Sequence, residues 1–141
     1  MERKDFIKKF AVGGSILLAA PTFLASCSDG NDEIINNPPN PNDITIDLTK
    51  SEFDALDAVG GFAYSGNLII IRSSDTQYTV LSKICTHQGC TVSYNASSNQ
   101  LPCACHGSLF NISGGVINGP ATQSLKTYST KVEGNNLIIS D

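Results

Sequence analysis

Residues 85–90 read CTHQGC and residues 103–108 read CACHGS, with twelve residues between the two segments. The chain contains only five Cys and two His, and four of the cysteines and both histidines lie in these two boxes. A Cys or His that stands alone is usually a small buried hydrophobe or a surface imidazole. Six such residues in so short a stretch instead predict a metal-binding site.

Each box offers one thiolate and one imidazole, from Cys85 with His87 and from Cys103 with His106. Two thiolates and two imidazoles are the set used where His replaces Cys on one iron of a two-iron cluster. The same set can hold a tetrahedral zinc ion, because C-x-H and C-x-x-H are close to structural zinc spacings. The remaining Cys, Gly and Ser of the boxes have no role in a zinc site. Iron is therefore favoured, and the colour of the protein would discriminate between the two metals.

The paired boxes, C-T-H-x-G-C and C-x-C-H-G-S, resemble those of Rieske iron-sulfur proteins, and the resemblance spans about residues 44–141. It implies a [2Fe-2S] cluster bound by the thiolates of Cys85 and Cys103 and the imidazoles of His87 and His106. Replacing two thiolates by neutral imidazoles lowers the electrostatic cost of adding an electron. Such centres span about −150 to +300 mV, against about −400 mV for plant-type ferredoxins. We expect a potential in the upper half of that span.

The resemblance also implies a disulfide between Cys90 and Cys105, which is typical of the high-potential type of Rieske protein. An export signal would place these cysteines in an oxidising compartment, where disulfides persist. The bond would join the two cluster loops and limit both their spreading and the access of solvent.

Two residues are expected to tune the cluster. Ser108 matches the family serine whose hydroxyl donates to a cluster sulfide. Phe110 stands where high-potential relatives have a Tyr that donates to a ligand thiolate. Because hydrogen bonds to sulfur are a control on potential, we expect a value somewhat below that of relatives with both donors.

The surface around the cluster departs from the family pattern. Gln88 stands at the tip of the first loop, where quinol-oxidising relatives carry Leu against an apolar quinol pocket. Gly119 and Pro120 match a Pro-containing loop that covers the cluster, but the second Pro of that loop is missing. His87 and His106 each keep one ring nitrogen off the metal, so they either couple electron uptake to proton uptake or only ligate iron.

The fold predicted beyond Asp43 is all-β, because short apolar runs with period-2 alternation are separated by turns. We expect a Rieske-like antiparallel β-sandwich or partial barrel, with a small cluster-binding subdomain formed by two loops at about residues 82–122. A helix is predicted only over residues 51–59, with Ser51 as its cap. The expected strands are residues 44–48, 68–72, 78–81, 125–132 and 137–140, with a hairpin turn at 133–136.

The N-terminus predicts export and lipidation. Residues 1–26 combine a basic start with an apolar run of about fifteen residues, which is typical of a signal peptide. The run is shorter than the roughly 20 residues that cross a bilayer. It ends in LASC, which resembles a bacterial lipobox with Cys27 as the lipidated residue. An uncleaved anchor with a free Cys27 thiol is the alternative, and the export route, twin-arginine or general, stays open.

Residues 27–42 are polar and rich in Pro and Asn, which predicts a flexible linker between the lipid and a domain at residues 43–141. Removal of residues 1–26 would leave five basic and eleven acidic residues. This acidic balance argues against nucleic acid as a partner and favours a basic one.

These features together predict one-electron transfer at a membrane surface by a subunit that is not a stand-alone enzyme. The disulfide, the second box and the Pro loop favour the iron-sulfur subunit of a quinol-oxidising respiratory complex, with a c-type cytochrome as a further partner. Gln88 and the lipid anchor favour a tethered carrier for another exported oxidoreductase, similar to arsenite oxidase. A ferredoxin for a Rieske oxygenase is less favoured, because such proteins usually lack the disulfide. The expected location is the periplasmic side of the inner membrane, or the cell envelope, of a bacterium.

Overall fold

The computed structural model describes residues 40–141. The predicted signal peptide, Cys27 and most of the linker lie outside the described residues. Within them, no helix is long and apolar enough to cross a membrane. The elements are β1 (Ile44–Asp47), the 3-10 helix η1 (Ser51–Asp57), β2 (Phe62–Ser65), β3 (Leu68–Arg72), β4 (Tyr78–Ser82), β5 (Gln100–Pro102), β6 (Leu109–Asn111), β7 (Val116–Asn118), β8 (Thr127–Glu133) and β9 (Asn136–Ser140).

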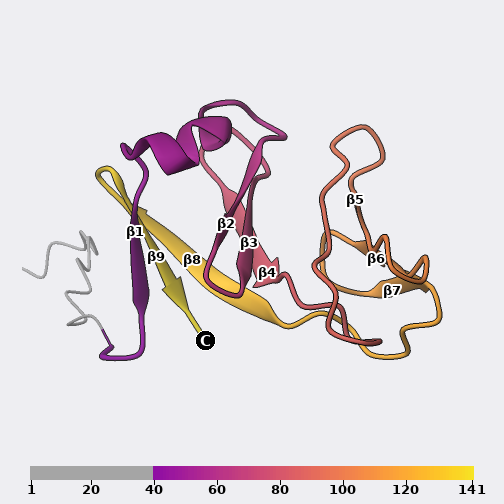
Figure 1. The fold of residues 1–141 in the computed structure, drawn as a ribbon. Coiled ribbons are helices and arrows are strands. Elements are labelled where there is room, and N and C mark those ends of the chain that lie inside the picture. The colour runs from indigo at the N-terminus through magenta and orange to yellow at the C-terminus, as the bar shows by residue number, and fades with distance from the viewer. Residues whose placement is uncertain (1–39) are drawn as a thin grey trace, which may run out of the picture. The chain divides into compact units, whose positions relative to one another are not determined.

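The strands form two antiparallel sheets, which confirms the all-β prediction (Figure 1). The larger sheet has the order β1-β9-β8-β4-β3-β2 and curls into a half-barrel, and the smaller has the order β5-β6-β7. Strands β4 and β8 are neighbours, with Val80 opposite Tyr128 and Leu81 opposite Thr127. All residues between these two strands therefore leave the larger sheet and return to it at one place. They form a separate subdomain that carries both boxes.

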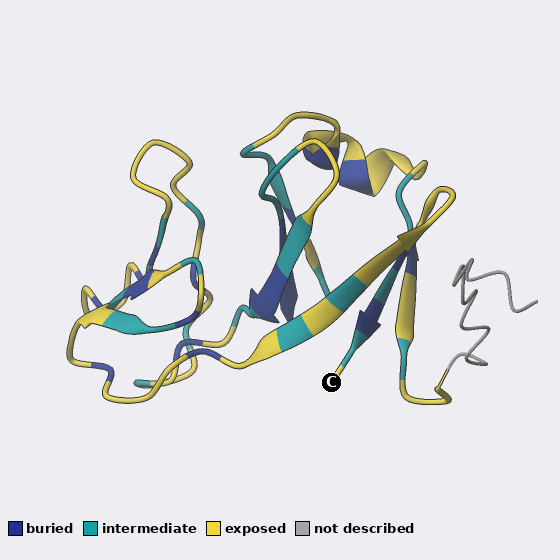
Figure 2. Cartoon of the chain, turned by 180° about the vertical axis from the view of Figure 1, so that it is seen from behind, coloured by how far each residue is buried: buried dark blue, intermediate teal, exposed yellow. Residues whose placement is uncertain are grey.

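Strand β3 lies between two hydrophobic cores because it is apolar on both faces (Figure 2). Ile69 and Ile71 pack with the cysteines of the boxes, whereas Leu68 and Ile70 pack with β1, β9 and η1 on the opposite face. Successive side chains of a strand point to opposite faces, so one strand serves both cores. The cluster-binding subdomain is thereby anchored on the larger sheet by buried apolar contacts.

The predicted helix differs from the observed one. The segment is a 3-10 helix that ends at Asp57, and Lys50 rather than Ser51 occupies the N-cap position, without a side-chain capping bond. Phe53 and Leu56 are its buried residues, and a spacing of three residues places side chains one above the other in a 3-10 helix. Val59, the last residue of the predicted helix, lies beyond the end of the observed one and is 54% exposed.

The C-terminal hairpin is confirmed, with Glu133 opposite Asn136 and a two-residue loop whose Gly134 has a φ of 59°. Glycine adopts this left-handed conformation without steric cost. The strand predicted to begin at residue 125 begins at Thr127 instead. Leu125 is buried in the core of the cluster-binding subdomain, and its N–H donates to the carbonyl oxygen of Gly114.

Candidate metal centre

The two boxes fold into loops with the same hydrogen-bond pattern. In the first, the N–H of Cys85 donates to the carbonyl of Cys90 at 2.7 Å, and that of Gly89 donates to the carbonyl of Cys85 at 2.9 Å. In the second, Cys103 donates to Ser108 at 2.8 Å and Gly107 to Cys103 at 3.1 Å. Each six-residue box is thus closed by a bond between its ends.

The glycines of the boxes have a conformational role. Gly89 has a φ of 78° and Gly107 a φ of 80°, a region that L side chains rarely adopt. A Cβ atom would meet nothing within 4 Å at either position, so the backbone angle and not crowding requires glycine. This turn therefore requires glycine at the fifth position of each box, for which the sequence pattern alone gave no reason.

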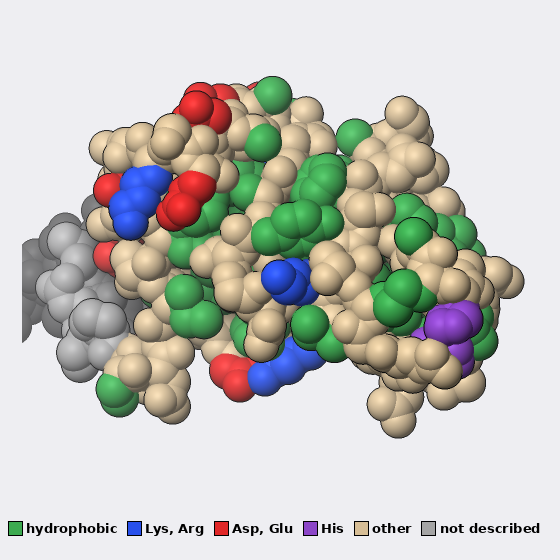
Figure 3. Space-filling model, in the orientation of Figure 1, with side chains coloured by type: hydrophobic (Ala, Val, Ile, Leu, Met, Phe, Trp, Pro, Cys, Tyr) green, Lys and Arg blue, Asp and Glu red, His purple; other side chains and the backbone are tan. Residues whose placement is uncertain are grey.

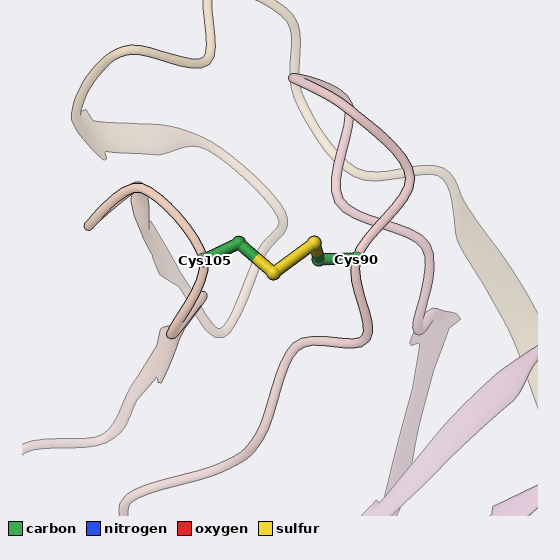
Figure 4. The surroundings of a disulfide bond; sticks show 2 residues. All are labelled: Cys90 and Cys105. Carbon is green, nitrogen blue, oxygen red and sulfur yellow. A yellow bond between two sulfur atoms is a disulfide. The ribbon is translucent and has the colours of Figure 1, made fainter.

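A disulfide between Cys90 and Cys105 joins the two loops, with the Cα atoms 6.5 Å apart (Figure 4). The predicted pairing is therefore present. The sulfur atoms of Cys90, Cys103 and Cys105 lie within 4.8 Å of one another. Because two of these sulfurs are bonded to each other, this group does not supply three thiolates. The disulfide instead packs beside the thiol of Cys103.

The two remaining cysteines of the boxes, Cys85 and Cys103, are free and buried. Burial raises the pKa of the Cys103 thiol, and the adjacent Cys85 thiol raises it further. The backbone N–H groups of Cys105 and His106 donate to the Cys103 sulfur and act in the opposite direction. Two adjacent buried sulfurs, one of them with two amide donors, suit thiolates that are neutralised by a bound metal.

The two histidines face each other from the two loops. Their ring centroids are 4.8 Å apart and their planes are at 86°. Among residues 40–141, the Nδ1 atom of His87 is the one buried side-chain nitrogen or oxygen without a hydrogen-bond partner. Leaving such an atom unpaired costs about 1–3 kcal/mol. A metal bond to Nδ1 would remove that cost, so the donor set of the two boxes fits the implied cluster.

The residues after β7 cover both loops. The N–H of Ala121 donates to the hydroxyl oxygen of Ser108 at 3.0 Å, and the hydroxyl of Thr86 donates to the carbonyl of Gln123 at 2.6 Å. The side-chain amide of Asn118 donates to the carbonyl of Gly107 at 3.3 Å. Thr86 and Asn118 were not singled out from the sequence, because their partners lie in other segments of the chain.

The remaining predicted residues occupy distinct environments. Ser108 is 1% exposed, and Phe110 is fully buried in the same hydrophobic core as Cys85 and Cys103. By contrast, Gln88 at the tip of the first loop is exposed. Gly119 and Pro120, which the sequence predicted to lie in the covering segment, are also exposed. They are joined by a cis peptide bond.

Comparison with known proteins agrees with this site. The pattern of the Rieske [2Fe-2S] domain matches residues 45–129. The chain is 29% identical over 144 residues to the cytochrome b6-f complex iron-sulfur subunit of Chlorobaculum thiosulfatiphilum, covering 99% of this chain and 75% of that protein. It is 47% identical over 72 residues to the same subunit of Synechococcus sp. (strain JA-3-3Ab), covering 51% of this chain and 42% of that subunit. The chain thus spans less than two thirds of the length of some of these relatives.

A solved structure resembles the described fold. The cyanobacterial plasma membrane Rieske protein PetC3 of Synechocystis PCC 6803 superposes with a TM-score of 0.52 at 31% identity, over 61% of this chain and 91% of that one. The expected cofactor is confirmed by the family match, which identifies a [2Fe-2S] cluster in place of zinc. On the match to residues 45–129, the two boxes and the disulfide between them, this chain belongs to the family of Rieske [2Fe-2S] domain proteins.

Proposed function

We propose that Cys85, His87, Cys103 and His106 bind the cluster, and that the chain is the iron-sulfur subunit of a quinol-oxidising respiratory complex at a membrane surface. The observation that carries the ligand assignment is the unpartnered, buried Nδ1 of His87 beside a pair of buried free thiols. A cluster held by two thiolates and two imidazoles takes up and releases one electron at a higher potential than an all-thiolate cluster.

The chain's own residues shape this electron carrier. The amides of Cys105 and His106 donate to the Cys103 sulfur and so stabilise its thiolate form. Cys85 and Cys103 are buried in the core that contains Phe110, and this burial excludes water from the thiolate side of the site. His106 is exposed, so the imidazole side is the side through which a partner would exchange electrons.

The ligand assignment is tested by iron and acid-labile sulfide content. Cys103→Ser is expected to lose the cluster and its visible circular dichroism, and His87→Cys to keep a cluster at a lower potential, because a thiolate adds negative charge. Cys27→Ser is the matched control, which should retain full cluster content. Normal iron content in Cys103→Ser would refute the assignment.

The assignment to a quinol-oxidising complex is supported by the relatives, which are named as subunits of cytochrome b6-f complexes. Deleting the gene should abolish quinol-dependent reduction of a c-type cytochrome by membranes. The wild-type gene should restore this activity and Cys103→Ser should not. A midpoint potential that falls as pH rises near neutrality would add support for coupled proton uptake.

A second candidate is a tethered carrier for another exported oxidoreductase, and the exposed amide of Gln88 favours it. A polar tip fits poorly in an apolar quinol pocket, because a buried amide without a partner is costly. If quinol oxidation persists in the deletion strain while the potential is independent of pH, this second function replaces the first.

We also propose that residues 1–26 direct export, that Cys27 is lipidated, and that residues 27–42 tether the head on the periplasmic side of the membrane. More than one acyl chain gives stable attachment without a spanning helix. Cys27→Ala should therefore move the protein from the membrane fraction to the soluble fraction. Retention of this variant in washed membranes would refute the lipid anchor.

A further inference from the structure

Three sulfur atoms of the two boxes lie together, and only two of them are bonded to each other. The Sγ atoms of Cys90, Cys103 and Cys105 are within 4.8 Å of one another. Cys90 and Cys105 form the disulfide, whereas Cys103 is a free thiol. A thiolate that attacks a disulfide sulfur displaces the other sulfur and forms a new disulfide. The Cys103 thiol is thus a nucleophile placed beside a bond that it can break.

The backbone holds the Cys103 thiol near the disulfide. Val92 and Cys103 form an antiparallel bridge, and the N–H of Ser93 donates to the carbonyl of Pro102 at 3.0 Å. The chain segments that carry Cys90 and Cys103 therefore run side by side. Because the sulfur atoms are already close, rotation of the side chains brings them into contact without a rearrangement of the loops.

Burial favours attack at one of the two disulfide sulfurs. Cys103 is 3% exposed and lies in the core of the cluster-binding subdomain, and Cys90 packs against that core. Cys105 is exposed. A bond from Cys103 to Cys90 stays at the core and releases Cys105 to water. A bond from Cys103 to Cys105 would instead close a small ring across Ala104, and a disulfide forced from its usual geometry is strained.

The released thiol is open to reagents from solution. Histidine side chains of the boxes, drawn in purple, reach the surface on the face shown in Figure 3. Cys105 directly precedes His106 in the second box, and both residues are exposed. Exposure is one of the conditions under which a cysteine thiolate reacts. A free thiol at Cys105 is therefore accessible in a way that the buried thiol of Cys103 is not.

We infer that loss of the cluster starts a thiol–disulfide exchange within the chain. The Cys103 thiolate attacks the Sγ atom of Cys90, the Cys90–Cys103 disulfide forms, and the Cys90–Cys105 bond breaks. Cys105 leaves as a thiolate and takes up the proton that Cys103 gave up. The number of disulfides is unchanged, so no oxidant or reductant is consumed. The inference rests on the proposed role of Cys103 as a ligand, because iron holds its sulfur while the cluster is bound.

The exchange masks one candidate ligand and exposes one reactive thiol. With Cys103 bonded to Cys90, the emptied chain lacks a complete ligand set, and any metal that binds must first reverse the exchange. Cys105 becomes a modification site that the loaded chain does not have. A small-molecule disulfide can capture it, because the Cys105 thiolate bonds to one sulfur and displaces the other as a thiolate. This capture prevents the reverse reaction and leaves the chain empty.

The test locates the free thiols before and after the cluster is removed. The full-length, cluster-containing protein is treated with an iron chelator under anaerobic conditions, which excludes pairing by an oxidant. Free thiols are trapped with N-ethylmaleimide in acid, where few thiolates remain to exchange. The disulfides are then reduced and labelled with iodoacetamide. Residues 84–125 contain no Lys or Arg, so trypsin leaves both boxes in one peptide, and its fragment ions show which label each cysteine carries.

Cluster removal is expected to move the maleimide label. In the loaded protein, trapped as it is denatured, the label should lie on Cys85 and Cys103. After chelation it should lie on Cys85 and Cys105, and Cys103 should lose it. The shift is expected because Cys103 becomes free to react only when iron no longer holds its sulfur.

Two variants form a matched pair that needs no chelator. Cys85→Ser and Cys103→Ser each remove one candidate ligand, but only Cys85→Ser keeps the nucleophile. Among the described residues, the Cys85 sulfur is not part of the group within 4.8 Å. Cys85→Ser should therefore carry the maleimide label on Cys105. In Cys103→Ser the only labelled cysteine of the boxes should be Cys85, with the Cys90–Cys105 disulfide intact.

Three results would overturn the inference. If the label stays on Cys103 in both the chelated protein and Cys85→Ser, no exchange takes place. A label on Cys90 in place of Cys105 would show that the attack occurs at the other sulfur. A label on Cys105 in Cys103→Ser would show that Cys103 is not the nucleophile. The ligand role is judged separately by iron content, since normal iron in Cys103→Ser refutes that role whichever cysteine carries the label.

Discussion

The hydroxyl oxygen of Ser108 accepts a hydrogen bond from the backbone N–H of Ala121, and both residues are buried. This bond links the second box to the segment that covers it. It leaves the hydroxyl proton of Ser108 free to donate elsewhere, which is the role expected for this residue toward a cluster sulfide.

Ser108→Ala is therefore expected to have two effects. The buried N–H of Ala121 loses its acceptor, which should lower the free energy of unfolding by about 1–3 kcal/mol. The midpoint potential should also fall, because a donor to sulfur is removed. Chemical denaturation and redox titration measure the two effects separately. Ser113→Ala, at an exposed position, is the control, and a potential unchanged in Ser108→Ala would contradict the tuning role.

Phe110→Tyr is expected to raise the midpoint potential. The Phe110 ring is fully buried in the core that contains Cys85 and Cys103, and the family resemblance implies that a Tyr hydroxyl at this position donates to a ligand thiolate. A hydrogen bond with a net value of about 0.5–1.5 kcal/mol corresponds to about 20–60 mV at about 59 mV per tenfold change. A redox titration followed by visible circular dichroism measures this shift in midpoint potential. An unchanged or lower potential would refute the role assigned to position 110.

The paired substitution Cys90→Ser with Cys105→Ser is expected to destabilise the cluster before the fold. The disulfide closes a loop with a sequence separation of 15, for which the chain-entropy contribution is about 3 kcal/mol. The larger sheet does not depend on this bond. On heating, visible circular dichroism should disappear at a lower temperature than the far-ultraviolet signal, whereas simultaneous loss of both signals would argue against this order.

Strand β3 offers a matched pair of substitutions. Ile70 and Ile71 are both fully buried but belong to different cores. Each change to Ala should cost about 2–5 kcal/mol of stability. Only Ile71→Ala should also accelerate loss of the cluster, because its cavity opens beside the core of the boxes. Equal rates of cluster release from both variants, measured with an iron chelator, would show that the two cores are not independent.

Part of the fold followed directly from the sequence pattern. Residues 68–71 form a continuous apolar run, residues 44–48 alternate between apolar and polar, and residues 137–139 are apolar after a turn, so these strands were predicted to within one residue of where they occur. The segment 51–59 was misjudged because its two buried residues, Phe53 and Leu56, suit a 3-10 turn as well as an α-helix. The short strands β2, β5, β6 and β7 were not predicted, since three or four residues are too few to show a period.

The cofactor, the candidate ligands and the disulfide pairing could be predicted from the amino-acid sequence, because the two boxes resemble those of Rieske proteins, whereas the donor set taken alone also fits zinc. Only the tertiary structure decided which atoms meet across the chain. The pairing of β4 with β8 returns residue 126 to the neighbourhood of residue 82, and the bonds from Thr86 to Gln123 and from Ala121 to Ser108 close the covering segment over the loops. Such contacts join residues far apart in sequence, because they form where side chains are buried together and where each buried polar group needs a partner. A local sequence pattern does not contain this information.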